Sequence, residues 1–210
     1  NGTQSVRAMV FDAQGQLIAK SKIDIEPYFS DQPGWAEQHA EYFWDALCKA
    51  CQALWPLLPI PKESIAAVSV TTQRATAIAM GADNQPLRPA ISWLDQRQVE
   101  TKPALGALES ALFTLVGAKP LADLMHKQAE ANWIAQNEPN IWDKVHKFVL
   151  LSGYHNYKLT GEYKDAIAST VGFLPFDYKT QQWADKKDWK WRAMPITQEM
   201  LPEVLPAGAE

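Results

Sequence analysis

Small and hydroxyl-bearing residues form a predicted tight turn near the start of the chain, which reads Gly2, Thr3, Gln4 and Ser5. Backbone N–H groups and hydroxyls gathered at such a turn bind anions, phosphate among them. Arg7 follows two residues later and would add a positive charge. These residues predict a phosphate-binding turn. The alternative is a plain hairpin turn, because motifs this short often match by chance.

A second polar pair, Gln73 and Arg74, follows a mostly apolar run at residues 65–71. That run predicts a buried strand, and ligands of α/β proteins gather where such strands end. An amide and a guanidinium fork each make more than one hydrogen bond, which suits the neighbouring hydroxyls of a polyol. We therefore expect Gln73 and Arg74, with the adjoining Ala75, to line a site for a hydroxyl-rich substrate.

A third segment carries Trp93, Asp95 and Arg97 at alternate positions. A tryptophan offers a broad apolar ring and one N–H donor, which suits a sugar as well as a protein core. Alternate residues of an extended segment lie on one side, so Asp95 and Arg97 either face the edge of the same site or pair with each other. Trp93 and Asp95 are included among the predicted substrate-binding residues, and both roles of Asp95 stay open.

No pattern in the sequence predicts a metal site or a complete catalytic set. His126 has the right chemistry for a base, but a lone histidine near a helix start is more often a cap or a surface residue. Cys48 and Cys51 have the spacing of a redox or metal pair. Because no further ligands lie close by in the sequence, we expect them to be core thiols.

The composition predicts a globular protein without a polyanionic or lipid partner. Apolar residues make up 47% of the 210 residues and charged residues 21%, and the net charge is −4 with no basic run. The chain has no apolar stretch of about 18 residues and no signal-peptide pattern. We therefore expect a cytoplasmic protein that binds neither nucleic acid nor membranes.

The predicted elements place the candidate residues at strand ends. Residues 6–11 and 17–25 predict a β-hairpin, and residues 34–58 hold an amphipathic helix with apolar positions at intervals of three and four. Residues 65–71 would join that hairpin in one sheet. Two apolar runs within residues 75–93 predict a further hairpin.

Helices dominate the remainder of the chain. They are predicted at residues 103–116, 125–136 and 141–159, and the last would end at Gly161, where glycine supplies the left-handed terminal residue. A short helix is predicted near residues 197–201. Strands followed by helices predict one α/β domain with a helical insertion.

The ordered motifs of the chain resemble those of the FGGY family of carbohydrate kinases, which includes glycerol kinases and xylulokinases. The family's Gly-Thr-x-Ser-x-Arg turn, Pro-Gly-Trp-x-Glu-Gln helix entry, Gln-Arg strand end, Pro-x-Ile-x-Trp-x-Asp-x-Arg segment and Leu-Thr-Gly element occur in the family's order. They occupy residues 2–7, 33–38, 73–74, 89–97 and 159–161. The aspartate that precedes the first motif in the family has no counterpart before Asn1.

This resemblance implies a fold, a domain organisation and a reaction. Residues 1–210 would form the N-terminal, sugar-binding domain of a two-domain kinase with the actin-like, ribonuclease H-like fold, a mixed sheet with flanking helices. They would lack the first strand of that domain, the C-terminal nucleotide domain and the catalytic base expected beyond Glu210. The full-length enzyme would transfer the γ-phosphate of MgATP to a hydroxyl of a sugar or polyol, whereas this part alone would be inactive. A homodimer is compatible with the resemblance.

The resemblance also assigns roles to the candidate residues. The turn at residues 2–5 and Arg7 would contact ATP phosphates, and Gln73 and Arg74 would contact the substrate. The next position departs from the pattern, because glycerol kinases have a glutamate there, xylulokinases a histidine and this chain Ala75. That leaves the substrate open. The alternative function is a non-catalytic actin-like module for sugar binding or regulation.

Overall fold

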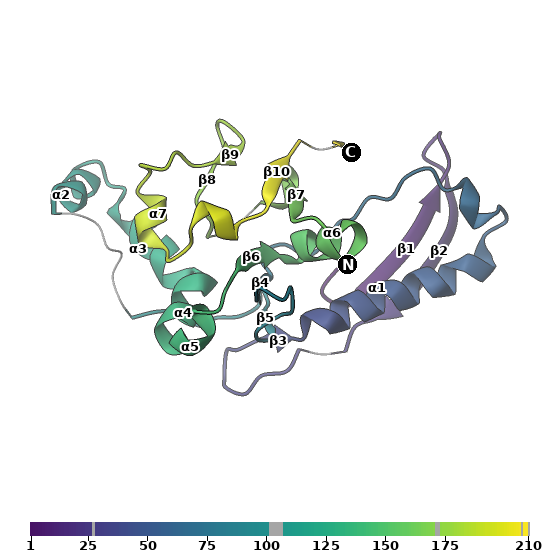
Figure 1. Cartoon of the computed structure of the whole chain (residues 1–210), viewed down its shortest axis with the longest axis horizontal. Coiled ribbons are helices and arrows are strands. Elements are labelled where there is room, and N and C mark those ends of the chain that lie inside the picture. Colours follow the sequence, from purple (N-terminus) through teal and green to yellow (C-terminus); the bar gives the residue numbers. More distant parts are fainter. Residues whose placement is uncertain (27, 101–106, 171–172, 207, 210) are drawn as a thin grey trace.

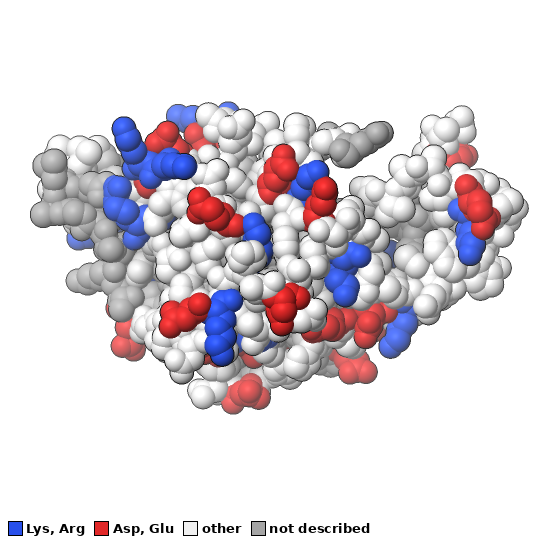
Figure 2. Space-filling model, in the orientation of Figure 1, with Lys and Arg blue, Asp and Glu red and all other residues white. Residues whose placement is uncertain are grey.

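The computed structural model describes residues 1–26, 28–100, 107–170, 173–206 and 208–209. A β-hairpin and a long helix form one end of the molecule, and a group of short helices forms the other (Figure 1). On the face drawn in Figure 2, acidic and basic side chains are interspersed. Among the described residues, no helix combines the length and apolar character needed to span a membrane.

The hairpin consists of strands β1 (Ser5–Phe11) and β2 (Leu17–Asp24), which pair antiparallel from Ser5 opposite Asp24. Asp12 closes its turn, because Oδ1 accepts the N–H groups of Gln14 and Gln16. Helix α1 (Ala40–Leu54) covers one face of the hairpin, with Phe43 fully buried against it. The predicted hairpin is confirmed, and so is the predicted amphipathic helix over residues 40–54. Its predicted first turns are wrong, because Glu37–Gln38 form a strand, β3.

A four-stranded antiparallel sheet lies beside this hairpin, in the order β3 (Glu37–Gln38), β5 (Ala90–Ile91), β4 (Ala77–Met80) and β6 (Lys147–Leu150). Strands β4 and β5 form the predicted second hairpin over fewer residues than expected. Neighbouring side chains of β4 enter two different hydrophobic clusters, which explains why all four residues of this strand are buried.

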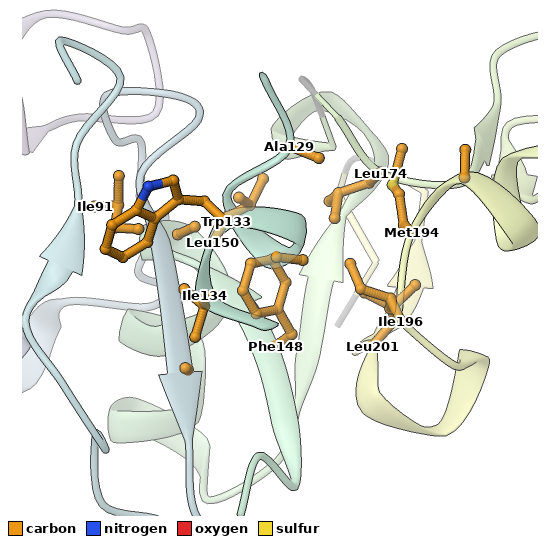
Figure 3. Close-up of a cluster of buried hydrophobic side chains, with 14 of the residues drawn as sticks. Ile91, Ala129, Trp133, Ile134, Phe148, Leu150, Leu174, Met194, Ile196 and Leu201 are labelled. Atoms are coloured by element: carbon orange, nitrogen blue, oxygen red, sulfur yellow. The ribbon is translucent and has the colours of Figure 1, made fainter. Parts of the chain in front are cut away.

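The first cluster joins the sheet to the helices. Figure 3 shows Trp133 and Ile134 beside Phe148 and Leu150, with Met194 from the C-terminal part on the other side. The helices that contribute to it are α3 (Lys119–Gln128), α4 (Glu130–Asn137), α5 (Pro139–Trp142) and α7 (Lys190–Ala193). Helix α2 (Ala107–Leu115) lies at its edge, where Phe113 contacts Trp189. The predicted helix over residues 125–136 is therefore two helices, which meet at the extended residue Ala129.

The prediction of one helix over residues 141–159 is wrong for the first half of that range. From start to finish, the range contains the end of α5, strand β6 and most of helix α6 (Leu151–Thr160). The run Lys147–Leu150 is short and apolar, and such a run fits a buried strand as well as a helix. Pairing of β6 with β4 decides in favour of the strand. Gly161 ends α6 at φ 79°, as predicted.

Residues 65–71 belong to no strand, so the prediction of one sheet joining them to the hairpin is also wrong. The strands β1 and β2 form a sheet of their own, and Val68 is 75% exposed. The apolar residues of the run are typical of a strand, but a strand also needs partners for its backbone N–H and C=O groups. Among the described residues, the backbone hydrogen bonds of this run are at its two ends, from Ile65 N–H to the Lys62 carbonyl and from the Asn1 nitrogen to the Thr71 carbonyl.

The C-terminal part contains two small strand pairs. Strands β7 (Lys164–Ala166) and β10 (Glu203–Leu205) pair in parallel, and β8 (Phe176–Asp177) pairs antiparallel with β9 (Gln182–Trp183). A 3-10 helix at Gln198–Met200 occupies the position of the predicted short helix. The result is a mixed α/β domain.

Candidate functional site

A cavity of about 640 Å³ lies between the start of the chain and the segment before β4. Its wall comes from residues between Asn1 and Met9, from residues 71–75 and from Trp93. The cavity thus brings together most of the residues that the sequence predicted for two separate contacts, phosphate and substrate. The predicted residues that line it are Gly2, Thr3, Ser5, Arg7, Gln73, Arg74, Ala75 and Trp93.

The Gly2–Ser5 turn uses part of its own hydrogen-bonding capacity. Gly2 N–H donates to the carbonyl of Ser5 at 2.9 Å, and the carbonyl of Gln4 accepts from Ile25 N–H. The exposed Gln4 is not among the lining residues. The turn therefore presents Thr3 and Ser5 to the cavity, while the Gly2 amide is engaged within the turn.

A chain of hydrogen bonds crosses the cavity wall. Trp93 Nε1 donates to Thr3 Oγ1 at 3.1 Å, and Thr3 Oγ1 donates to Gln73 Oε1 at 2.9 Å. Gln73 also contacts the Tyr28 hydroxyl, which lies 2.7 Å from its Nε2. Burial raises the pKa of Tyr28, so its hydroxyl keeps its proton at neutral pH. The wall is a fixed polar network built from four distant segments.

Tyr28 was not identified from the sequence. It lies in the loop after β2, and no local spacing distinguishes it from a tyrosine that packs in a core. The only signal is its position shortly before the Pro33-Gly34-Trp35 motif. Tertiary contact with Gln73 is what brings Tyr28 to the site.

Two cations at the cavity are free of protein partners. Arg7 and Arg74 are both exposed, and neither forms a hydrogen bond or an ion pair with the described residues. No Asp or Glu is among the described residues that line the cavity. An arginine fork without a carboxylate partner is suited to bind an anionic or hydroxyl-rich ligand.

The backbone turns sharply directly after Arg74. Ala75 has φ 53°, in the left-handed region that residues with a Cβ rarely adopt. Such conformations persist where the surrounding structure enforces them, and they are frequent at ligand sites. Here the turn separates Gln73 and Arg74, which line the cavity, from the buried strand β4.

Asp95 lies outside the cavity, in a buried ion pair. Its carboxylate accepts two hydrogen bonds from the Arg97 guanidinium, both at 2.7 Å, and the N–H of Ala36 at 2.7 Å. The side chains of Asp95 and Arg97 are each 3% exposed. Of the two roles considered for Asp95, the structure shows the pairing with Arg97.

Arg97 links this pair to its neighbours. Its guanidinium lies 2.9 Å from Glu37 Oε1 and within 4.4 Å of the ring centres of Trp35 and Trp133. Glu130 is close to both Asp95 and Arg97, and burial raises its pKa to about 7. The cluster holds the segment after Trp93 against β3 and α4, so it supports the cavity wall indirectly.

The other residues considered in the sequence analysis lie outside the cavity. Asp165 accepts the Ser152 hydroxyl at 2.6 Å and the Ala166 N–H at 2.8 Å, and so fixes the loop after α6. His126 is buried, with Nδ1 2.8 Å from the Ala193 carbonyl oxygen. Cys48 and Cys51 are free thiols, and among the described residues no cluster suited to hold a metal ion is found.

Comparison with known proteins agrees with this picture. The model of the FGGY family of carbohydrate kinases, N-terminal domain, matches residues 1–210. The chain is 28% identical to a glycerol kinase of Thermococcus gammatolerans and 27% identical to a xylulose kinase of Lactococcus lactis, and each match covers 97% of this chain. It spans 41% and 40% of the lengths of those two relatives.

The solved structures show the same fold. A xyloylose kinase from Brucella ovis superposes with a TM-score of 0.78 at 23% identity, covering 97% of this chain and 41% of that one. A xylulose kinase from Rhodospirillum rubrum gives a TM-score of 0.75 at 19% identity, with 98% and 41% covered. The chain therefore belongs to the FGGY family of carbohydrate kinases and matches its N-terminal domain.

Proposed function

We propose that this chain is the sugar-binding domain of an ATP-dependent carbohydrate kinase with the actin-like fold. The enzyme would transfer the γ-phosphate of MgATP to a hydroxyl of a sugar or polyol. The single observation that carries the proposal is the shared cavity, where Thr3, Gln73, Arg74 and Trp93 meet without any carboxylate in the described lining.

The residues of the cavity suit the two ligands of such a reaction. Arg7 and the Ser5 hydroxyl would hold phosphate oxygens and offset their negative charge. Thr3, whose hydroxyl donates to Gln73, would act on the site by fixing the Gln73 amide. Arg74 would donate to substrate hydroxyls, with the exposed face of Trp93 beside it. Gln73 is held in place by Thr3 and Tyr28, so its orientation is set before a ligand arrives.

Magnesium does not fit the described lining, which has no carboxylate, and we propose instead that it arrives with ATP. A base that accepts the hydroxyl proton is also absent from the described lining residues. We therefore place that base, with the nucleotide-binding domain, in a part of the full-length protein after residue 210. Residues 1–210 would contribute positioning and charge compensation.

Residue 75 bears on which acceptor of this class the protein uses. Ala75 offers no polar side chain at the position where the family pattern has glutamate in glycerol kinases and histidine in xylulokinases. A site without that group depends more on Arg74 and Gln73 for hydroxyl recognition.

The proposal is tested with the full-length protein and a panel of polyols, pentuloses and hexuloses, by coupling ADP release to a spectrophotometric assay. ADP release that depends on one acceptor, and that falls in Thr3→Ala, supports the kinase. Acceptor binding by calorimetry without any ADP release would instead support the non-catalytic module.

A further inference from the structure

The side chains that line the cavity offer more hydrogen-bond donors than unengaged acceptors. Arg7 and Arg74 carry N–H donors and no acceptor, and neither forms a hydrogen bond or an ion pair with the described residues. The described lining contains no Asp or Glu, which would supply strong acceptors. Its side-chain acceptors are therefore amide and hydroxyl oxygens.

The amide oxygens of the described lining, from Gln73 and Asn1, are already engaged by the protein. Gln73 Oε1 accepts the Thr3 hydroxyl at 2.9 Å and lies 2.9 Å from the Tyr28 hydroxyl. Asn1 Oδ1 lies 3.1 Å from Nε2 of His155, a residue of the helix α6 that Figure 1 shows beside the N-terminus. Since an amide oxygen cannot donate, that imidazole nitrogen is the donor. Little acceptor capacity is left for the hydroxyl protons of a ligand.

The backbone on both sides of Arg74 is held in place. Gln73 N–H donates to the Asn1 carbonyl at 2.7 Å. On the other side, Ala75 turns the chain at φ 53° and Thr76 is buried. The Arg74 side chain itself is exposed at the cavity. Its guanidinium is therefore carried by a fixed backbone and remains free to orient on a ligand, which lowers the cost of binding.

A site of this kind suits a ligand group that only accepts hydrogen bonds. Each hydroxyl of a neutral polyol donates as well as accepts, so it needs an acceptor on the protein. An ionised carboxylate only accepts, and a guanidinium binds it through two parallel N–H···O bonds. Arg7 and Arg74 also give the described side chains of the lining a positive charge, which attracts an anion.

We propose that the phosphate acceptor is a polyhydroxy acid, an aldonate for example, whose carboxylate pairs with Arg74. The inference rests on the proposed function, in which Arg7 and Ser5 hold phosphate oxygens. Ala75 beside Arg74 is uncharged, so the acid meets no carboxylate there. A hydroxyl oxygen of the acid would bond to the γ-phosphorus while the bond to ADP breaks, and the hydroxyl proton would pass to the base that we place after residue 210.

The test uses the full-length protein and acceptors that differ only in the carboxylate. The aldonates xylonate and gluconate are compared with xylitol and glucitol, which carry a hydroxymethyl group in its place. Coupled ADP release gives kcat/KM for each acceptor, and calorimetry gives its Kd without ATP. Arg74→Gln removes the charge and keeps an amide donor. Lys20→Gln, the same change at an exposed cation of β2 outside the described lining, is the control.

We expect kcat/KM to be higher for an aldonate than for its alditol by about tenfold or more. Arg74→Gln should reduce that preference by about tenfold or more, because the charge-assisted pair forms only with the acid. Lys20→Gln should leave the preference unchanged. The KM for ATP should be the same in all three proteins, because Arg7 and not Arg74 is assigned to phosphate.

Three results would overturn the inference and leave the kinase proposal intact. They are an alditol used as well as its aldonate, an unchanged preference in Arg74→Gln, and a preference for the phosphate ester of an alditol over the aldonate. If no acceptor supports ADP release, the kinase proposal fails, and calorimetry still decides whether the cavity binds an acid. Tighter binding of the aldonate that is lost in Arg74→Gln supports an acidic ligand, and equal binding of aldonate and alditol refutes it.

Discussion

At the scale of single residues, hydrogen bonds decide which polar atoms of the cavity remain available to a ligand. Trp93 donates to Thr3, and Thr3 donates to Gln73, so these side chains are already oriented by the protein. Arg74 forms no hydrogen bond or ion pair with the described residues and is exposed at the cavity. Its guanidinium is therefore free to donate to a ligand in the cavity.

If Arg74 binds the substrate as proposed, Arg74→Ala in the full-length protein removes a charge-assisted hydrogen bond. We expect kcat/KM to fall by about thirtyfold, equivalent to about 2 kcal/mol, as is usual for hydrogen bonds to charged groups. The Tm should stay the same, because the side chain has no protein partner to lose. Lys20→Ala, another exposed cation located on β2 outside the cavity lining, serves as the control. A lowered Tm with normal kcat/KM would reject the assignment of Arg74 to the site.

His155 gives a pH dependence of stability. It is fully buried, with Nε2 3.1 Å from Asn1 Oδ1, and burial together with the N-terminal ammonium lowers its pKa from 6.5 to about 4. Because the folded-state pKa lies below the unfolded value, the neutral imidazole stabilises the fold above pH 6.5. This stabilisation is lost as the pH falls toward 4.

Between pH 7 and pH 4.5, the free energy of unfolding should fall by roughly 2–3 kcal/mol more in the wild type than in His155→Gln. Urea titrations of both proteins at both pH values measure this difference. Glu130 and Asp165, whose pKa values are raised by burial, change stability in the opposite direction, and comparing the two proteins cancels their effect. If the free energy of unfolding changed equally with pH in the two proteins, the pKa of His155 would be the same in the folded and unfolded states, which would contradict the prediction.

At the scale of elements, the charges around Arg97 join the loop after β5 to β3 and α4. Removing one member of a buried ion pair leaves the others without compensation. Arg97→Ala should therefore lower the free energy of unfolding by about 3–5 kcal/mol, and Arg97→Lys by less, because lysine keeps the charge but loses the planar fork.

Denaturant unfolding checks this prediction against Lys22→Ala, which removes an exposed ion pair with Asp24. The control should cost less than about 1 kcal/mol, as is usual for surface pairs. If Arg97→Ala costs no more than the control, the cluster does not hold these elements together.

At the scale of the whole molecule, the chain covers about two fifths of the length of its relatives, 41% for the glycerol kinase of Thermococcus gammatolerans. The described cavity lining contains no base for a hydroxyl proton. We therefore expect purified 1–210 to form no ADP in the presence of acceptors that the full-length protein uses. Acceptor-dependent ADP formation by 1–210, above that of a mock purification, would contradict this.

Much of the architecture was predictable from local patterns. The period of three and four residues located α1, strand-like runs on either side of a turn located β1 and β2, and Gly161 marked the end of α6. The candidate residues Thr3, Gln73, Arg74 and Trp93 were also identified, and all four line one cavity. These successes share a cause, since periodicity and turn chemistry depend on residues close together in the sequence.

What only the tertiary structure decided depends on contacts between distant segments. Pairing with β4 made Lys147–Leu150 a strand inside a predicted helix. Residues 65–71 lie outside the sheet because their backbone has no strand partner among the described residues. Asp95 lies outside the cavity because it pairs with the Arg97 guanidinium. Tyr28 belongs to the site because its hydroxyl forms a hydrogen bond with Gln73, which is 45 residues further along the chain. A short apolar run or a single polar residue has several acceptable environments, and the available partners select one of them.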